Sequence, residues 1–214
     1  MIEKEIENND LSPPTGGQGA DDLGAPTGGQ GADESKSAKG GIRTRGLRIF
    51  LIGFMGCGKT HWGKQLSEKL MLPFFDLDEK IEEHEERTIT RIFENEGEEY
   101  FRLLEKDVLH LLTENHETFV MACGGGTPCF FNNIDYLKKN GVTVWINCSF
   151  DSLYNHLEKE KEARPLIKDL SDEQLKSYIS KKFRGRRIFY QQASLTLQED
   201  EMTIDNLINK IFHT

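Results

Sequence analysis

The chain has 214 residues, of which 27 are basic and 36 acidic, so its formal net charge is −9. This length suits one ordinary domain with an extension rather than two domains, and the acidic excess argues against a nucleic-acid-binding surface, which would be basic. No apolar run approaches the ~20 residues of a membrane helix, and the N-terminus lacks a secretory signal. The four cysteines form no CxxC pair. We therefore expect a cytoplasmic protein with free thiols.

Residues 1–46 differ in composition from the rest of the chain. They hold ten of the twenty glycines, three of the six prolines and no aromatic residue, and the repeat PTGGQGAD occurs at 14–21 and again at 26–33. Such a segment buries too little apolar surface to offset the entropy of ordering. We therefore expect a disordered, low-complexity extension at 1–46 and one domain at 47–214. The extension is either a flexible interaction arm or a neutral product of repeat expansion.

Alternating elements are expected along the remaining chain. Short apolar runs predict strands at 47–52, 74–77, 118–122, 142–146 and 194–197. Apolar residues at helical spacing predict helices at 61–71, 78–86, 98–114, 134–139, 152–161, 171–187 and 203–212, and Thr90 is expected to cap a turn before the third of them. Strands that alternate with helices predict a parallel sheet with helices on both faces. Ligands of such sheets bind beyond the carboxyl ends of the strands.

A phosphate-binding loop follows the first strand. Residues 53–60 are GFMGCGKT, which matches G-x-x-x-x-G-K-[ST] between a strand and a helix. In such a loop successive N–H groups face an anion, Lys59 reaches the β- and γ-phosphates, and the Thr60 hydroxyl binds Mg²⁺. The residues of this segment expected to contact ATP are Gly56, Cys57, Gly58, Lys59, Thr60 and His61. The alternative is a glycine-rich turn without a ligand.

The nucleotide is expected to serve a kinase of small metabolites. The chain lacks the Asn-Lys-x-Asp motif that binds guanine, and a motor or helicase would be larger. Asp76 and Asp78 end the second strand, one crossover helix after the loop, so the topology places both carboxylates near the phosphates. One would hold Mg²⁺ through water while the other accepts a proton from an alcohol nucleophile. Alternatively, Asp78 caps the helix that follows.

Further polar motifs follow. The glycine triplet at 124–126 either exposes N–H groups to a ligand or forms an ordinary tight turn. Arg102 either faces a ligand or pairs at the surface with Glu98, Glu99 or Glu105. Arg164 precedes a proline and either closes over phosphates or is a solvated loop residue. Three arginines cluster before Tyr190, namely Arg184, Arg186 and Arg187. The histidines show no metal-ligand spacing.

Six motifs in order give the chain, from residue 47 onward, a resemblance to the shikimate kinases. They are GFMGCGKT at 53–60, DLD at 76–78, EYFR at 99–102, CGGGTP at 123–128, ARPL at 163–166 and RRIFY at 186–190. The resemblance implies an α/β domain, a three-layer P-loop kinase fold with a five-stranded parallel sheet in the order 2-3-1-4-5 and a lid segment. It also implies transfer of the γ-phosphoryl group of ATP to the 3-hydroxyl of shikimate, which gives shikimate 3-phosphate for chorismate and the aromatic amino acids.

The resemblance implies partners and catalytic groups as well. ATP and shikimate are the expected partners and Mg²⁺ the cofactor, and we expect a monomer that binds neither nucleic acid nor membrane. Lys59, Asp78 and Arg164 are the expected catalytic residues. Thr60 and, through water, Asp76 would hold the metal ion, while Asp78 would bind the ring hydroxyls and act as the base.

Arginines complete the implied substrate site. Arg102, Gly125 and Arg186 would contact shikimate together with Asp78, whereas Arg164 on the lid would contact the ATP phosphates. Arg187 is adjacent to Arg186, which leaves a one-residue ambiguity. Two arginines and glycine N–H groups suit the carboxylate of the acceptor.

One departure and two alternative functions stay open. Many relatives carry an adenine-stacking arginine at a position near Leu157, so the adenine contacts are unassigned. A gluconate-type or other small-alcohol kinase is one alternative, and a non-catalytic nucleotide-binding regulatory protein is the other. The second would be marked by damage to the catalytic motifs, which are intact.

Cys57 lies inside the loop at a helix N-terminus, where a thiolate is favoured. We predict that its pKa is lowered, that it is the first thiol to be modified and that ATP protects it. The alternative is an inert buried thiol.

Overall fold

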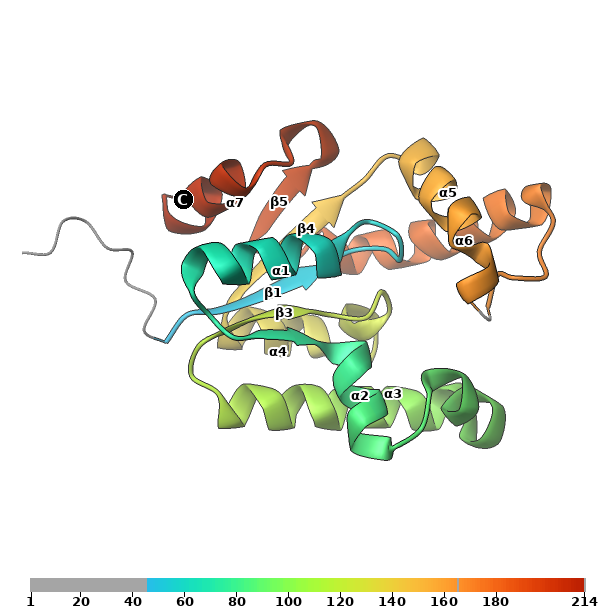
Figure 1. Ribbon diagram of the computed structural model, residues 1–214, viewed down its shortest axis with the longest axis horizontal. Coiled ribbons are helices and arrows are strands. Elements are labelled where there is room, and N and C mark those ends of the chain that lie inside the picture. Colours follow the sequence, from blue (N-terminus) through green and yellow to red (C-terminus); the bar gives the residue numbers. More distant parts are fainter. Residues whose placement is uncertain (1–45, 165, 214) are drawn as a thin grey trace, which may run out of the picture. The chain divides into compact units, whose positions relative to one another are not determined.

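Five parallel strands form one sheet in the described part of the chain (Figure 1). The computed structural model describes residues 46–164 and 166–213, so the extension expected at 1–46 lies outside the described residues except for its last position. The strands are β1 (Arg48–Ile52), β2 (Phe74–Asp76), β3 (Phe119–Ala122), β4 (Val142–Asn147) and β5 (Leu195–Gln198). Their order, β2-β3-β1-β4-β5, confirms the predicted sheet.

Strand β1 is the centre of the sheet. Its Leu51 lies opposite Ala122 of β3 and Val144 of β4. Four of the five β1 residues and all four β3 residues are buried, which is typical of parallel strands with both faces covered. Because parallel strands share a direction, the segments that follow β1, β2, β3 and β4 all emerge at one edge of the sheet.

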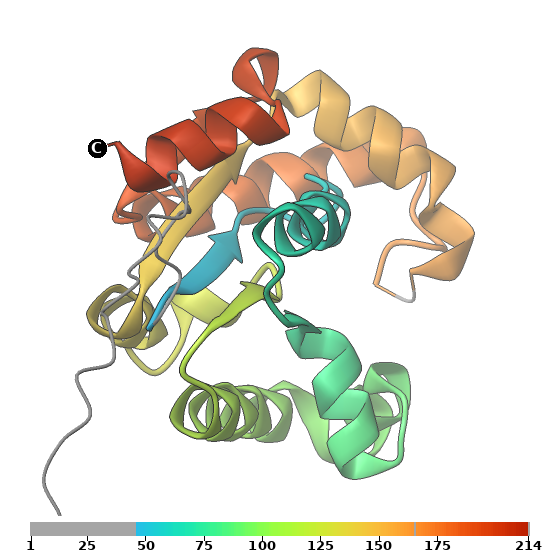
Figure 2. The ribbon, with the colours of Figure 1, turned by 60° about the vertical axis from the view of Figure 1, so that its left-hand side comes forward.

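Helices connect the strands and cover the sheet. They are α1 (Lys59–Leu70), α2 (Leu77–Glu85), α3 (Ile89–Asn115), α4 (Asn133–Asn140), α5 (Phe150–Lys159), α6 (Asp172–Tyr190) and α7 (Ile204–Phe212), with short 3₁₀ turns η1 (Thr127–Cys129), η2 (Lys161–Ala163) and η3 (Glu199–Glu201). Figures 1 and 2 show α1 and α7 on one side of the sheet and α4 on the other. The result is the predicted three-layer α/β fold.

The third helix differs from the sequence prediction. It begins at Ile89 and continues to Asn115, but Gly97, with a φ of 82° and a ψ of 179°, breaks the helical backbone and kinks the helix. The side chain of Thr88 caps its N-terminus by accepting the N–H of Arg91. Thr90, which we expected to be a cap, lies inside the first turn, so that prediction is wrong.

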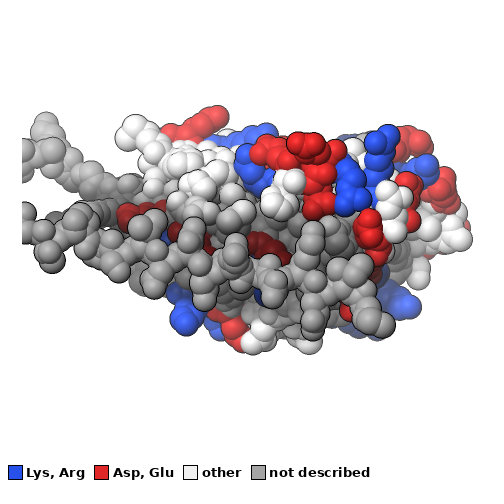
Figure 3. All heavy atoms as spheres, turned by 90° about the horizontal axis from the view of Figure 1, so that it is seen from below, with Lys and Arg blue, Asp and Glu red and all other residues white. Residues whose placement is uncertain are grey.

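Charged groups of both signs share the described surface. Figure 3 shows acidic and basic side chains interleaved on the described part of one face. Surface ion pairs such as Lys80 with Glu83 and Arg87 with Glu96 bring the two signs together. Among the described residues, no helix is long and apolar enough to cross a membrane.

Candidate active site

The phosphate loop connects β1 to α1 through backbone conformations that glycine adopts readily. Gly56 and Gly58 have φ values of 78° and 84°, in the left-handed region that disfavours other residues. Gly58 is also the N-cap of α1, and no side chain caps this helix. The N-terminal N–H groups of α1 are therefore available to an anion, and the helix dipole adds positive potential there.

A cavity of about 690 Å³ opens beside this loop. Loop residues 55–60, His61 and Trp62 line it together with Asp76 and Asp78. The Lys59 ammonium donates to the carbonyl oxygens of Gly53 and Phe54, at 3.0 and 2.9 Å. All six residues expected to contact ATP in this segment, including the exposed His61, thus lie on one cavity wall.

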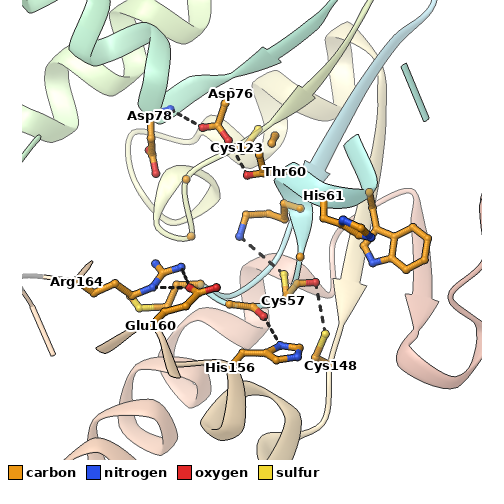
Figure 4. Close-up of a pocket in the computed structure, with 18 of the residues that line it drawn as sticks. Cys57, Thr60, His61, Asp76, Asp78, Cys123, Cys148, His156, Glu160 and Arg164 are labelled. Atoms are coloured by element: carbon orange, nitrogen blue, oxygen red, sulfur yellow. Dashed lines mark hydrogen bonds and ion pairs between the residues drawn. The ribbon is translucent and has the colours of Figure 1, made fainter. Parts of the chain in front are cut away.

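Asp76 and Thr60 face each other at the edge of this cavity (Figure 4). The Thr60 hydroxyl donates to Asp76 Oδ2 at 2.6 Å. Asp76 also caps α2, because its Oδ1 accepts the N–H of Asp78 at 3.1 Å. The alternative interpretation of Asp78 as the helix cap is therefore wrong, since Asp76 has that role and the Asp78 side chain lines the cavity.

Asp78 is a buried carboxylate in an acidic environment. Burial raises its pKa most, Glu105 and Asp76 raise it further, and Lys59 and Arg102 oppose them, with a resulting pKa of about 6. This value lies well above the ordinary 3.8 of an aspartate. The carboxylate is therefore a stronger base than an exposed one and is still largely ionised at neutral pH.

A second cavity, of about 480 Å³, adjoins the first. The shared lining residues are Met55, Asp78, Gly124, Gly125 and Arg164. The second cavity is also lined by residues of α2, α3 and α6, including Arg102, Glu105 and Arg186, and by Gly126, Leu166 and Ile167. The sequence-predicted acceptor residues Asp78, Arg102, Gly125 and Arg186 therefore all border one space.

Arg102 is held in place by carboxylates and aromatic rings. It donates to Glu105 at 2.7 Å and to Glu98 at 3.3 Å, and its guanidinium carbon lies 4.5 Å from the centre of the Phe130 ring. Arg102 does pair with glutamates of its own helix, but the prediction that this pair lies at the surface is wrong, because Arg102 is only 8% exposed. Its planar donor group is preorganised at the cavity wall and suits a carboxylate.

The glycine triplet brings its backbone close to these side chains. A Cβ built on Gly124 would lie 2.7 Å from Glu105 Oε1 and 3.0 Å from Asp78 Oδ1. A Cβ on Gly126 would lie 2.8 Å from the Arg102 guanidinium. The triplet is thus required for close packing around the carboxylate and the arginine, which an ordinary turn would not need.

Gly126→Ala tests this packing. Gly126 has φ −98° and ψ −19°, so alanine fits the backbone and the expected effect comes from displacement of Arg102 alone. Loss of a charge-assisted hydrogen bond, worth ~1.5–3 kcal/mol, should raise the KM for shikimate roughly tenfold or more. The control is Gly185→Ala, where no atom lies within 4 Å of the new Cβ. Steady-state kinetics with an unchanged KM in Gly126→Ala would contradict the assignment.

The remaining predicted arginines occupy different positions. Arg164 lines both cavities and forms an ion pair with Glu160 at 2.5 Å. Arg186 lines the second cavity, 5.7 Å from the centre of the Phe54 ring, whereas Arg187 is exposed. This geometry favours Arg186 over Arg187 as the arginine that faces a ligand.

Sequence reasoning missed several residues that support the site. Glu105 is 1% exposed and accepts from Arg102 and from the Thr127 hydroxyl, the latter at 2.6 Å. Its three-residue spacing from Arg102 was a signal, but it indicated only a surface pair. Tyr190, which ends the RRIFY motif, is buried and donates to the Gly125 carbonyl at 2.5 Å. Nothing in the sequence indicated His156, whose Nδ1 lies 2.8 Å from the Gly56 carbonyl.

Comparison with known proteins places this site in a family. The family model described as shikimate kinase matches residues 55–214. A curated shikimate kinase of Azobacteroides pseudotrichonymphae is 43% identical over 164 residues, which cover 77% of this chain and 96% of that protein. The chain belongs to the shikimate kinase family. Membership makes it an enzyme, a phosphotransferase that phosphorylates shikimate in aromatic amino acid biosynthesis, as the sequence predicted.

Solved structures of shikimate kinases show the same fold. The crystal structure of the Bacteroides thetaiotaomicron shikimate kinase matches with a TM-score of 0.71 and 38% identity, over 77% of this chain and 95% of that one. The Acinetobacter baumannii shikimate kinase in complex with shikimate matches with a TM-score of 0.65 and 32% identity, over 77% and 90%. These relatives favour the shikimate kinase assignment over the gluconate-type and non-catalytic alternatives.

Proposed function

We propose that this shikimate kinase family member binds ATP in the larger cavity and shikimate in the smaller one, and transfers the γ-phosphoryl group to the 3-hydroxyl. The observation that carries the proposal is the shared wall of the two cavities, which contains Asp78 and Arg164. A donor and an acceptor in adjoining spaces would meet at these two side chains. Adjoining sites of this kind would bring the two reactants together, and positioning is most of what phosphoryl transfer requires.

On the nucleotide side, each loop residue has a proposed task. The N–H groups of Gly56, Cys57 and Gly58 would hold the β-phosphate at the N-terminus of α1. Lys59 would exchange its carbonyl partners for the β- and γ-phosphates, while His61 would border the nucleotide at the cavity rim. Arg164 would leave Glu160 for the γ-phosphate, where charge spreads as the bond to ADP breaks.

Thr60 and Asp76 fit a magnesium site. A hydroxyl and a carboxylate oxygen 2.6 Å apart at the phosphate loop are hard oxygen donors, and Mg²⁺ in kinases is held by few protein groups, several waters and the phosphates. Thr60 would bind the ion directly and Asp76 through water. The ion, when bound, neutralises charge on the β- and γ-phosphate oxygens.

On the acceptor side, Arg102, Arg186 and the Gly125 backbone would hold the shikimate carboxylate. Asp78 would accept hydrogen bonds from ring hydroxyls and orient the 3-hydroxyl toward the γ-phosphorus. As the new O–P bond forms and the bond to ADP breaks, the Asp78 carboxylate takes the hydroxyl proton.

The raised pKa of Asp78 predicts a pH dependence. Because the base must be ionised and the pKa of Asp78 is about 6 in the ligand-free chain, kcat/KM for shikimate should rise with pH through about 6 and level off above it. Below that pH the decline should approach about tenfold per unit. A profile of kcat/KM that is flat from pH 5 to 7.5 would argue against Asp78 as the base.

We also propose that residues 1–46 are a separate, dispensable extension and that 47–214 is the catalytic domain. Among the described residues, both cavities are lined by residues after 54, which supports a catalytic domain at 47–214, and we propose that this enzyme is a monomer. The four cysteines, all among the described residues, form no disulfide, which supports the expected cytoplasmic location. Deleting 1–46 should leave kcat and both KM values unchanged; a several-fold loss of turnover would show that the extension reaches the site.

The acceptor assignment is tested by an ADP-release assay with the full chain. Shikimate, gluconate and nucleoside monophosphates are supplied side by side with ATP and Mg²⁺. Shikimate should be the strongly preferred acceptor, because only it combines a carboxylate for the arginines with ring hydroxyls for Asp78. Preference for gluconate or a nucleotide would refute the proposal.

A further inference from the structure

Two cysteines from distant parts of the sequence meet behind the phosphate loop. Cys57 lies in the loop that follows β1, and Cys148 directly follows β4. Since β1 and β4 are paired neighbours, the ends of the two strands lie side by side. The Cys148 thiol donates to the Cys57 carbonyl at 3.6 Å (Figure 4).

The surroundings make Cys57 the nucleophile of this pair. The Lys59 ammonium lies 3.8 Å from its sulfur, and both thiols line the 690 Å³ cavity, through which a small oxidant has access. Burial raises the pKa of Cys57, but the Cys148 hydrogen bond and the Lys59 charge outweigh it and lower the pKa to about 6. Burial raises the pKa of Cys129 to about 11 and that of Cys123 as well, and the interaction with Cys57 together with burial raises the pKa of Cys148. Cys57 is therefore the thiol of the four that ionises first, and Cys148 can react only after Cys57 has been oxidised.

We propose that Cys57 and Cys148 form a redox modification site, at which a peroxide converts the two thiols to a disulfide that switches off nucleotide binding. In the first step the Cys57 thiolate attacks one peroxide oxygen, the O–O bond breaks, and Cys57 sulfenic acid and hydroxide form; the hydroxide takes up the proton that the Cys57 thiol released and becomes water. In the second step the Cys148 sulfur, having lost its proton, attacks the Cys57 sulfur and displaces hydroxide, which takes up that proton as water. Two thiols lose two electrons in total, and one peroxide gains them.

The disulfide would act on the loop through geometry. Bonding to Cys148 would pull the Cys57 sulfur away from Lys59 and toward the start of α5, whose N-cap is Ser149. The Cys57 N–H is one of the groups proposed to hold the β-phosphate, so its displacement weakens ATP binding. Because disulfides exchange with thiols, a dithiol reductant should restore the loop. Bound ATP should slow the reaction by filling the cavity.

The experiment treats the full chain with hydrogen peroxide, with and without ATP, and maps disulfides by mass spectrometry of unreduced peptides. The expected result is a Cys57–Cys148 linkage, loss of most of the turnover, and recovery of both after dithiothreitol. The inference rests on the proposed function only for the effect on turnover, since the linkage is detected by mass whatever the substrate. Each protein is compared with its own untreated activity.

Two variants sharpen the result. Cys148→Ser should form no disulfide and should accumulate a Cys57 sulfenic acid that dimedone traps. Cys129→Ser should form the Cys57–Cys148 disulfide as the protein without substitutions does. Peroxide that oxidises other cysteines first, or a Cys57–Cys148 linkage that leaves ATP affinity unchanged, would overturn the proposal. If Cys148→Ser fails to fold, peptide mapping of the unmodified sequence still decides between a disulfide and over-oxidised Cys57.

Discussion

Asp78→Asn is expected to lower turnover with shikimate about 10²–10⁴-fold, the usual contribution of a general base. The substitution preserves shape but removes the proton acceptor between the two cavities. Shikimate affinity should fall too, because an amide accepts hydrogen bonds at one end only. ATP affinity should persist, since Lys59 and the loop N–H groups are untouched. Near-normal turnover would refute the catalytic role, and lost ATP binding would mean that Asp78 supports the loop instead.

The same variant should be more stable at neutral pH. The pKa of Asp78 is raised from 3.8 to about 6 in the folded chain, so the protonated form is favoured by folding. That stabilisation is complete below pH 3.8 and is lost as the pH rises through about 6. Asn mimics the neutral form and should raise the free energy of unfolding by roughly 1–3 kcal/mol at pH 7.5. The matched control in denaturant unfolding is Asp205→Asn, a substitution of an exposed residue in the first turn of α7. If both variants changed the free energy of unfolding by the same small amount, burial of the Asp78 charge would not be destabilising.

Arg102→Ala is the second large prediction, with an effect on both binding and stability. Removing a partner that donates a charge-assisted hydrogen bond of ~1.5–3 kcal/mol should raise the KM for shikimate about 10–100-fold. It also leaves Glu105 buried beside Asp78 without its cation, which costs about 3–5 kcal/mol of unfolding free energy. The KM for ATP should be nearly unchanged.

Arg164→Ala provides the contrast. Arg164 lines both cavities and is partly exposed. Its loss should mainly lower kcat, because its charge would stabilise the negative charge that spreads over the γ-phosphate in the transition state. Arg187→Ala, an exposed arginine of α6, should alter neither parameter. The same kinetic defect in Arg102→Ala and Arg164→Ala would show that at least one of the two roles is wrong.

Local patterns predicted the elements, and contacts distant in sequence decided the site. Alternating apolar runs and helical spacings predicted strands and helices, because backbone preferences and periodicity act within a few residues. The sheet order came only from the resemblance to the shikimate kinases. Thr88 and Thr90 are similar candidates for the cap of α3, and the structure shows that Thr88 has this role, since its hydroxyl accepts the N–H of Arg91. The sequence also left open which of Asp76 and Asp78 caps α2, and only the hydrogen bond from the Asp78 N–H to Asp76 in the structure decided it.

Burial was the property that sequence reasoning could not supply. Glu105 follows Arg102 by three residues, a spacing common on exposed helix faces, yet both are buried because the glycine triplet and η1 pack over them. Cys57 and Cys148 are 91 residues apart in the sequence, and their contact depends on the pairing of β1 with β4. Such juxtapositions arise from topology, and no local pattern marks them.

The central claim is that the two adjoining cavities bring the γ-phosphate of ATP to the 3-hydroxyl of shikimate. Phosphorus NMR of a reaction containing the full chain, ATP, Mg²⁺ and shikimate tests it most directly. The account predicts one new phosphate monoester, coupled to the proton on carbon 3 of the shikimate ring, in an amount equal to the ADP formed. ADP without a shikimate ester, or an ester on another hydroxyl, would contradict it.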